Sequence, residues 1–264
     1  MLLGGRVALI TGAARGIGKA SALILAQEGA DVGVVDILPD VEETGREITR
    51  LGKRSAWASF DISDPFQVAA GVGKIRAELG DIDVLVNNAG IVANIASLMK
   101  MTHEAWQREI SVNLSGAFNM IKEVMGPMVQ RKWGRIINIS SGAASGGLHR
   151  QIGYAASKAG LLGLTKTITL EHARDGITSN AILPGLIGTE LVSMMPEEIR
   201  ERAVSIIPAR RIGLTEEVGH LIAFLASDRA AYINGAEIRV DGGMGLNVGT
   251  LGSRKELRES DVSR

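Results

Sequence analysis

Two side chains that could exchange a proton, Tyr154 and Lys158, stand four residues apart in the sequence YAASK. On a helix this spacing puts the phenol and the ammonium on one face, with a rise of about 6 Å between them. A nearby ammonium favours the phenolate and so lowers the pKa of a tyrosine from its usual value of about 10. We therefore interpret the pair as a candidate acid–base couple, although the same spacing also occurs on solvated helices that do no chemistry.

A glycine-rich turn, TGAARGIG at residues 11–18, could bind phosphate. Glycines at 12, 16 and 18 let the backbone turn sharply and approach a pyrophosphate, whose charge then meets a helix N-terminus. The spacing Gly-x3-Gly-x-Gly differs from the usual Gly-x-Gly-x2-Gly fingerprint. Its position between the first predicted strand and the first predicted helix nevertheless favours a dinucleotide cradle.

Asp36 follows the second predicted strand, where its carboxylate could accept hydrogen bonds from the adenosine ribose hydroxyls. The same carboxylate would repel a 2′-phosphate. Arg15 points the other way, because a basic residue in the glycine turn could pair with that phosphate. The like-charge clash at Asp36 is the harder effect to escape, so the sequence favours NAD over NADP. Asp36 could alternatively be only a turn residue before Pro39.

The scaffold that must hold these residues alternates short apolar runs with longer segments of helical period. The predicted strands are 7–10, 32–35, 55–60, 83–86, 135–139, 178–182 and 237–240, and the predicted helices are 19–28, 41–51, 65–79, 104–131, 153–175 and 215–227. Strands apolar on both faces and separated by helices indicate a parallel sheet covered on both sides. We predict an α/β fold, a single-domain Rossmann-type doubly wound parallel sheet of about seven strands.

Because the alternation shows no linker, we assign one domain to residues 1–247. The segment 186–214 interrupts the rhythm and is rich in Met, Glu and Arg, which is typical of a mobile lid. Residues 248–264 are interpreted as a polar C-terminal tail that frays.

The composition excludes several other classes of protein. Hydrophobic residues make up 45% of the 264-residue chain, which is too many for a disordered or fibrous protein. Lys plus Arg and Asp plus Glu are balanced at 29 each, which argues against a nucleic-acid or membrane-surface partner. There is no cysteine, and the histidines lack ligand spacing, so we predict no metal site. With neither a leader nor a membrane-crossing apolar stretch of roughly 20 residues, we expect a cytoplasmic protein.

Further motifs accompany the glycine turn and the tyrosine–lysine pair. They are Asn87-Asn88-Ala89-Gly90, Asn113, Ser141, Pro184-Gly185 and Val240-Asp241-Gly242-Gly243. In this order, from residue 5 to about 245, the set resembles the short-chain dehydrogenase/reductase family, in its branch of about 250 residues.

This resemblance implies a role for each of four catalytic residues. Tyr154 would be the general acid for reduction, or the base for oxidation, at the substrate oxygen. Ser141, selected over Ser140 by the family's spacing, would hydrogen-bond that oxygen and stabilise the charge that develops there. Lys158 would lower the pKa of the tyrosine and hold the nicotinamide ribose. Asn113 would position a water that links Lys158 to solvent.

The resemblance also implies a cofactor surface. Asp61 and Ile62 would lie at the adenine, and residues 88–90 along the adenosine ribose. The predicted cofactor-binding set is Gly12, Arg15, Gly16, Ile17, Gly18, Asp36, Asp61, Ile62, Asn88, Ala89, Gly90, Tyr154, Lys158, Pro184, Gly185, Ile187 and Thr189. The predicted cofactor is NAD, with NADP as the less favoured alternative.

The predicted substrate wall lies between Ser141 and Tyr154, in the loop after Gly90 and in the lid. Small residues at 142–147 would leave room above the nicotinamide, and the lid methionines offer adaptable apolar surface. The predicted substrate-binding residues are Ala143, His149, Arg150, Leu186 and Met194. His149 and Arg150 are the polar exceptions, and they would bind either an anionic group or another subunit.

These features lead to a main hypothesis of an NAD-dependent oxidoreductase that interconverts a hydrophobic secondary alcohol and its ketone. The alternatives are an NADP-dependent 3-oxoacyl carrier-protein reductase and, from another class, a catalytically silent dinucleotide-sensing regulator. The regulator is disfavoured because all four catalytic residue types are present. The resemblance further implies a homotetramer, with helices 104–131 and 153–175 packed across one interface.

Overall fold

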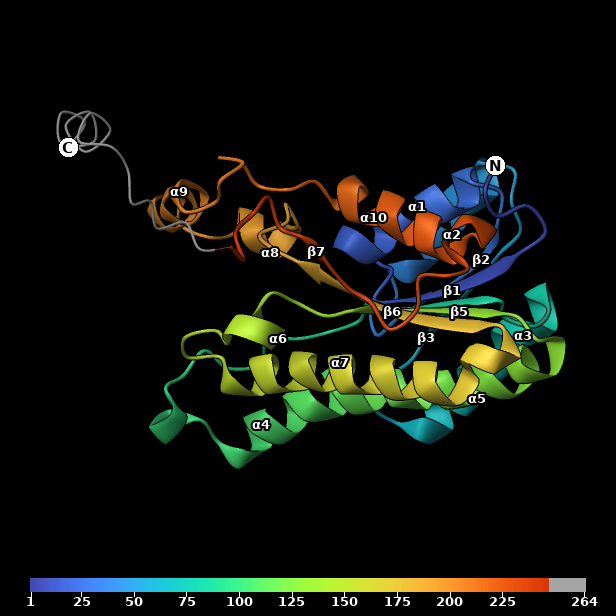
Figure 1. The fold of residues 1–264 in the computed structure, drawn as a ribbon, viewed down its shortest axis with the longest axis horizontal. Helices are drawn as coiled ribbons and strands as arrows, with labels where there is room; N and C mark the ends of the chain where they lie inside the picture. Colours follow the sequence, from blue (N-terminus) through green and yellow to red (C-terminus); the bar gives the residue numbers. More distant parts are fainter. Residues whose placement is uncertain (247–264) are drawn as a thin grey trace.

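Seven parallel strands form one sheet in the order β3-β2-β1-β4-β5-β6-β7 in the computed structural model, which describes residues 1–246 (Figure 1). The strands are β1 Val7–Thr11, β2 Asp31–Asp36, β3 Ser55–Ser59, β4 Val84–Asn87, β5 Gly134–Ile139, β6 Ile177–Pro184 and β7 Glu237–Val240. Their order reverses beside β1, which pairs with β2 on one side and β4 on the other. Such a reversal opens a crevice at the carboxyl ends of the strands, where ligands of open α/β sheets bind. The predicted fold class is therefore confirmed.

Helices cover both faces of the sheet, as Figure 1 shows. One face carries α1 Gly16–Gln27, α2 Val41–Arg50 and α10 Thr215–Ala226, and the other carries α3 Pro65–Leu79, α5 Gly116–Arg131 and α7 Ile152–His172. Each face has its own apolar core, with Leu25 and Ile222 in the first and Ile75 and Met120 in the second. Fully burying a side chain of this size contributes roughly 1.5–3 kcal/mol relative to leaving it exposed.

Local signals in the sequence explain where several helices begin and end. Before α3, the Asp64 side chain accepts hydrogen bonds from the backbone N–H groups of Phe66 and Gln67, and Pro65 occupies the first helical position. At the end of α5, Lys132 adopts a left-handed conformation with φ of 55°, which stops the helix two residues before β5. Capping residues thus set the spacing between helix and strand.

The predicted helix 104–131 differs from the structure in its middle. Helix α4, His103–Ile110, passes through a π-helical segment, Ser111–Ser115, before α5 begins. Such segments widen one turn of a helix and are frequent at functional sites. The interruption contains Asn113, one of the four predicted catalytic residues.

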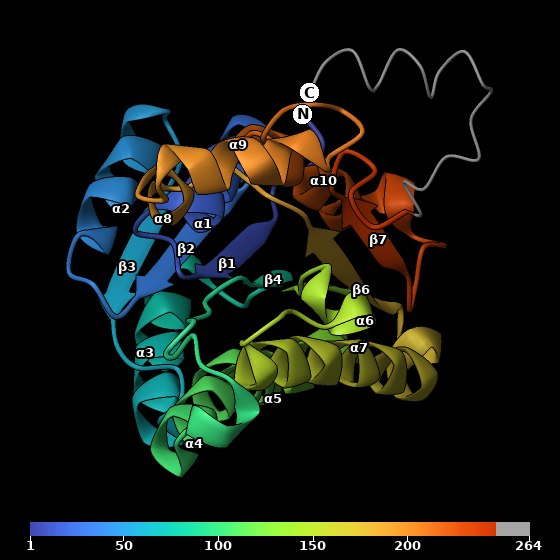
Figure 2. The ribbon, with the colours of Figure 1, turned by 90° about the vertical axis from the view of Figure 1, so that its left-hand side faces the viewer.

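The predicted lid contains two short helices, α8 Glu190–Ser193 and α9 Glu197–Ser205. Both lie beyond the carboxyl ends of the strands, on the side of the sheet that carries α1 and α10 (Figures 1 and 2). The two ends of this segment pair with each other. Ile187 and Gly213 form an isolated parallel β-bridge, and the Gly213 N–H donates to the Leu186 carbonyl at 3.0 Å. These contacts join the two ends of the predicted lid.

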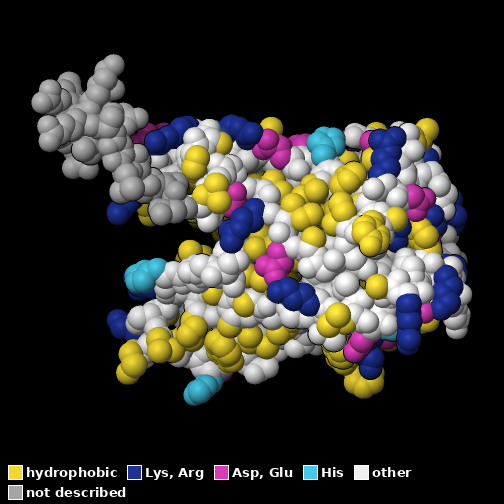
Figure 3. Space-filling model, in the orientation of Figure 1, with side chains coloured by type: hydrophobic (Ala, Val, Ile, Leu, Met, Phe, Trp, Pro, Cys, Tyr) yellow, Lys and Arg dark blue, Asp and Glu magenta, His cyan; other side chains and the backbone are white. Residues whose placement is uncertain are grey.

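A hollow is visible between two lobes at the end toward which the strands point (Figure 3). One lobe carries α8 and α9, and the other carries α4 and the four-residue helix α6, Ala143–Gly146. The small residues 142–147, predicted to leave room above the nicotinamide, contain this helical turn. Within residues 1–246, no helix combines the length and apolar character needed to cross a membrane. The predicted tail, 248–264, lies outside the described residues.

Candidate active site

The four predicted catalytic residues come together at the carboxyl ends of the strands, although they are distant in the sequence. Ser141 follows β5, Tyr154 and Lys158 lie near the start of α7, and Asn113 lies in the π-helical segment. Because parallel strands end at one edge of a sheet, the residues that follow them meet there. The structure thus assembles the set that the sequence predicted.

The hydroxyl groups of Tyr154 and Ser141 lie close enough for Ser141 to influence the phenol. The Ser141 hydroxyl oxygen accepts the backbone N–H of Ala143, at 3.1 Å. This bond holds the serine in place from within its own loop. The two hydroxyls therefore form one polar surface on which a carbonyl oxygen can be bound.

Burial raises the pKa of the Tyr154 phenol, and the Ser141 hydroxyl opposes that effect. The predicted lowering of this pKa by Lys158 is not found. The lysine nitrogen lies 5.8 Å from the centre of the tyrosine ring and donates to the carbonyl of Ile139, at 2.8 Å. Burial dominates because it removes the phenolate from water, while the lysine charge faces a different hydrogen-bond partner.

Lys158 is itself buried, with 4% of its surface exposed. Burial lowers the pKa of its ammonium group from 10.5 to about 8. The protonated form still predominates at neutral pH. The site therefore holds a positive charge in a place where charge is costly.

Asn113 uses its carboxamide to hold the chain beyond β4. Its oxygen accepts the Ile91 N–H at 2.7 Å, and its nitrogen donates to the Ile91 carbonyl at 2.9 Å and to Ser157 at 3.1 Å. A Cβ added at Gly90 would lie 3.1 Å from the lysine nitrogen and 3.3 Å from the Asn113 oxygen. Asn113 and Lys158 therefore lie on either side of Gly90, close enough for a proton relay between them. The predicted role of Asn113 in positioning a water stays a prediction.

The glycine turn after β1 has the shape expected of a phosphate cradle. Gly12 has a φ of 67°, and a Cβ there would lie 2.8 Å from the Cα of Ala89. At Gly18 a Cβ would overlap the carbonyl oxygen of Gly12. Only glycine fits these two positions, and the turn leads directly into the N-terminus of α1 at Gly16.

Asn88 supports the glycine turn with its side chain. Its amide nitrogen donates to the carbonyls of Thr11 and Gly12, each at 3.0 Å. The Thr11 hydroxyl in return accepts the N–H groups of Asn88 and Ala89, each at 3.1 Å. These bonds hold the carboxyl ends of β1 and β4 together. The Asn88 amide nitrogen therefore stabilises the glycine turn. Thr11 begins the predicted glycine turn, but the sequence analysis gave it no role.

Asp36 ends β2 and faces the same cradle. One carboxylate oxygen accepts the Ala14 N–H at 3.0 Å, and the other accepts the Leu38 N–H at 3.0 Å. The carboxylate is thereby fixed beside the glycine turn while remaining partly exposed. The next residue, Ile37, is exposed and uncharged.

Thr189 links the predicted lid to the cradle. A Cβ at Gly16 would lie 3.3 Å from the threonine methyl group. Pro184 ends β6, Gly185 lies against Asp241 beyond β7, and Ile187 is buried with 4% exposure. The segment predicted to contact the nicotinamide therefore runs across the strand ends to the glycine turn.

Asp61 and Ile62, predicted at the adenine, have other partners in the structure. Asp61 accepts hydrogen bonds from Ser63, which lower its pKa against the effect of burial, and it pairs with Arg108 at 3.0 Å. Ile62 is 6% exposed and packs against Gly116. Contact of these two side chains with an adenine stays a prediction.

The chain shows clear similarity to known enzymes. A family model described as "Enoyl-(Acyl carrier protein) reductase" matches residues 12–245. A solved structure of levodione reductase is 33% identical, with a TM-score of 0.89 over 93% of this chain and 99% of the other. The chain is a short-chain dehydrogenase/reductase. It is accordingly an oxidoreductase that uses a nicotinamide dinucleotide.

Curated relatives of this short-chain dehydrogenase/reductase carry related names. The 3-oxoacyl-(acyl-carrier-protein) reductase FabG of Thermotoga maritima is 44% identical, over 92% of this chain and 99% of the relative. The enzyme of the same name from Escherichia coli is 41% identical, over 91% and 97%. The acetoacetyl-CoA reductase of Shinella zoogloeoides is 43% identical, over 90% and 98%.

The predicted substrate residues of this short-chain dehydrogenase/reductase are less closely gathered than the catalytic ones. Ala143 is buried beside Ser141, and Leu186 is partly buried at the start of the lid. Met194 is exposed on the lid, and His149 and Arg150 are exposed on the turn before α7. Arg150 has a φ of 64°, and its carbonyl accepts the Ala96 N–H at 2.9 Å. Their contact with a substrate stays a prediction.

Sequence analysis also overlooked Glu109, a carboxyl group inside the protein. It is 0% exposed and lies four residues before Asn113. That spacing, which places two side chains on one helix face, was the available signal.

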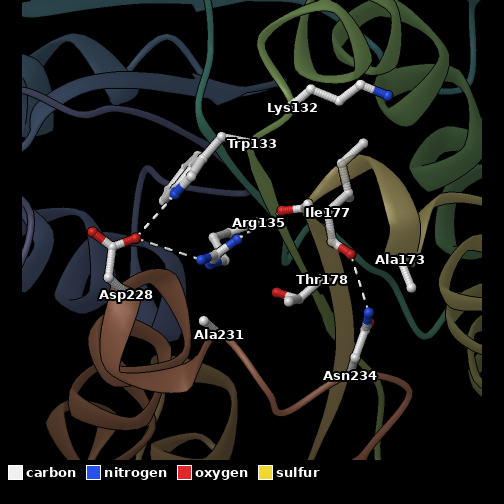
Figure 4. Close-up of a pocket in the computed structure, with 10 residues that line it drawn as sticks. Lys132, Trp133, Arg135, Ala173, Ile177, Thr178, Asp228, Ala231 and Asn234 are labelled. Carbon is white, nitrogen blue, oxygen red and sulfur yellow. Dashed lines mark hydrogen bonds and ion pairs between the residues drawn. The ribbon is translucent and has the colours of Figure 1, made fainter.

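A cavity of about 290 Å³ lies at the opposite edge of the sheet, where β5 and β6 begin. Trp133, Arg135 and Asp228 line it, and Figure 4 shows them turned toward one another from different elements. None of the predicted site residues lines this cavity. Among residues 1–246, no cluster of three or more His, Cys, Asp or Glu side chains could hold a metal ion.

Proposed function

We propose that this short-chain dehydrogenase/reductase reduces the ketone of a 3-oxoacyl thioester to the corresponding alcohol. The observation that carries the proposal is the similarity, at 41–44% identity over nearly their whole lengths, to reductases named for 3-oxoacyl carrier proteins and acetoacetyl-CoA. These names favour the 3-oxoacyl alternative over the main prediction of a hydrophobic secondary alcohol. The site geometry is compatible with either ketone.

The residues that surround the glycine turn fit a nicotinamide dinucleotide. Gly12 and Gly18 leave no room for side chains where a pyrophosphate would approach, and α1 presents its N-terminus there. Asp36 would receive the adenosine ribose hydroxyls, and Lys158 the nicotinamide ribose. The bound dinucleotide supplies the hydride.

Tyr154 would act as a general acid in this reduction. Its raised pKa keeps the phenol protonated at neutral pH, which suits a group that must give a proton to the carbonyl oxygen. Ser141 accepts an N–H from its own loop and so keeps its hydroxyl proton available for the same oxygen. The positive charge of Lys158 would stabilise the phenolate that remains after proton transfer.

We further propose NADH as the hydride donor. Asp36 is fixed by two backbone N–H groups, so its negative charge cannot swing away from a 2′-phosphate without losing both bonds. Ile37 offers no positive charge to compensate. Arg15 is exposed at the start of α1, and its pairing with a phosphate is the competing possibility.

One set of rate measurements tests the substrate and the cofactor separately. We expect kcat/KM for acetoacetyl-CoA to be at least about tenfold higher with NADH than with NADPH, and higher than for cyclohexanone or acetophenone with NADH. A preference for NADPH would overturn the assignment of Asp36. A preference for the cyclic or aromatic ketone would restore the secondary-alcohol hypothesis.

Two further predictions accompany this function. The closure of 186–214 over bound substrate and the homotetramer both remain proposals. Gel filtration of the purified chain tests the second, since a monomer would contradict it.

A further inference from the structure

Glu109 is buried in the wall of the candidate active site, in a place where an apolar side chain would be expected. It is 0% exposed, and it is the one residue of α4 that is buried. Removing a carboxyl group from water is costly unless hydrogen bonds replace the lost hydration. The contacts of Glu109 should therefore show what the carboxyl group does there.

One carboxyl oxygen of Glu109 holds the loop that follows Gly90. It accepts the backbone N–H of Ala93 at 2.7 Å and that of Asn94 at 3.3 Å. One turn later along the same helix, Asn113 holds Ile91 by both its N–H and its carbonyl. Two side chains on one helix face thus hold residues 91–94 in a single conformation.

The other carboxyl oxygen faces the first turn of α7. It has no hydrogen-bond partner within the described residues, and a Cβ added at Gly153 would overlap it. Gly153 immediately precedes Tyr154. The N-terminal end of a helix carries unpaired N–H groups and partial positive charge, which favours an acidic group at this position.

We propose that Glu109 is a positioning residue, which sets the distance between the substrate wall at residues 91–97 and the helix turn that bears Tyr154. Its carboxyl group lies between these two parts and contacts both. A third tie, from the Ala96 N–H to the Arg150 carbonyl at 2.9 Å, closes the far end of the same wall. The inference does not depend on which ketone is reduced.

Two substitutions of Glu109 distinguish the effect of its hydrogen-bond acceptor from the effect of its side-chain volume. Glu109→Gln keeps an oxygen that accepts the two N–H groups, whereas Glu109→Leu has a similar size and no acceptor. In the leucine variant we expect faster hydrogen exchange at the amides of Ala93 and Asn94, by about tenfold or more, because both donors are left unpaired. The glutamine variant should exchange like the wild type.

Kinetics supply the second measurement. For Glu109→Leu we expect KM for acetoacetyl-CoA to rise about tenfold, while the Kd for NADH stays within about twofold, since the cofactor cradle is held by other residues. Glu109→Gln should restore KM. Should acetoacetyl-CoA not be a substrate, the best ketone found replaces it, and the exchange measurement needs no substrate at all.

Glu104→Leu is the matched control, because Glu104 lies on the exposed side of the same helix. It should leave exchange and KM unchanged. The proposal would be overturned if Glu109→Leu lowered only the melting temperature and left amide exchange and KM as in the wild type. It would equally be overturned if Glu109→Gln behaved like Glu109→Leu, since acceptor geometry would then not be the cause.

Discussion

Each edge of the sheet buries one positively charged side chain, but the two charges have different neighbours. At the carboxyl edge, Lys158 has one backbone carbonyl as its hydrogen-bond partner, and burial lowers its pKa to about 8. At the amino edge, Arg135 donates to the carbonyls of Gly134 and Gly176 and lies 3.5 Å from the carboxylate of Asp228. Burial lowers the pKa of both groups, but Arg135 has the Asp228 carboxylate to oppose that effect, whereas no charged partner among the described residues opposes it at Lys158.

Aromatic packing adds to the compensation at the amino edge. Two guanidinium groups lie over the ring of Trp133, with that of Arg6 3.6 Å and that of Arg135 4.3 Å from the ring centre. Its indole N–H donates to Asp228 at 2.9 Å. Figure 4 shows Trp133, Arg135 and Asp228 of this cluster beside the cavity. Cation–π contacts and an ion pair there join the N-terminal segment, β5 and the turn after α10.

The comparison separates residues with structural roles from those that we propose carry out the chemistry. A cavity lined by paired charged and aromatic side chains lies at one edge, while two buried polar atoms without a hydrogen-bond partner in the described residues, on Asn87 and Glu109, lie toward the other. Open α/β sheets bind their ligands at the carboxyl edge, which agrees with this division. Substitutions at the carboxyl edge should therefore change activity more than stability, and those at the amino edge should do the reverse.

The largest effect is expected at the carboxyl edge for Tyr154→Phe. Removing the phenol hydroxyl removes the proposed proton donor, so kcat should fall by about 10²–10⁴-fold. The melting temperature should change little, because phenylalanine keeps the ring and the loss of one hydroxyl contact costs only about 1 kcal/mol. Turnover and thermal unfolding measured on the same preparation check both parts. Wild-type turnover would remove Tyr154 from the mechanism.

The convergence of the catalytic residues was predictable because it follows from local patterns. Apolar runs of four to six residues located the strands, and parallel strands bring the residues after them to one edge. Ser141 and Asp36 were both placed in this way. Strand ends shifted by one or two residues, as in β6, which continues to Pro184. Such shifts depend on pairing with neighbouring strands, which sequence periodicity does not contain.

Other features depended on tertiary contacts and were missed. A helical period of 3.6 residues does not reveal the π-helical turn around Asn113. The pKa of Tyr154 was predicted to fall because the sequence shows a lysine four residues away, but it does not show how deeply the phenol is buried. Glu109 was not singled out, because the sequence does not show that residues 93–94 and Gly153 pack against it. These three features share one cause, since each depends on what packs against the helix from elsewhere.

A pH-dependent stability is the next largest effect, again from the carboxyl edge. Lys158 has a pKa of about 8 when folded and 10.5 ordinarily, so between these values the unfolded state binds more protons. The stability contributed by this group must then rise with pH over that window. From about pH 8 to pH 10 the gain should approach 2–3 kcal/mol. Urea unfolding of the wild type and of Lys158→Met should show this rise only in the wild type, and parallel pH profiles would refute the burial of its charge.

The smallest effect distinguishes the amino edge. Arg135→Met keeps much of the side-chain length but leaves buried carbonyls without their donor, so we expect a loss of about 1–2 kcal/mol in unfolding free energy. Because none of the predicted catalytic residues lies there, kcat and KM should stay within about twofold at a temperature where the variant is folded. Lys132→Met is the matched control, since its ion pair with Asp175 involves an exposed lysine and should contribute less than about 1 kcal/mol. If Arg135→Met instead reduced kcat as strongly as Tyr154→Phe while leaving stability intact, the amino edge would be part of the site, and the division between the two edges would be wrong.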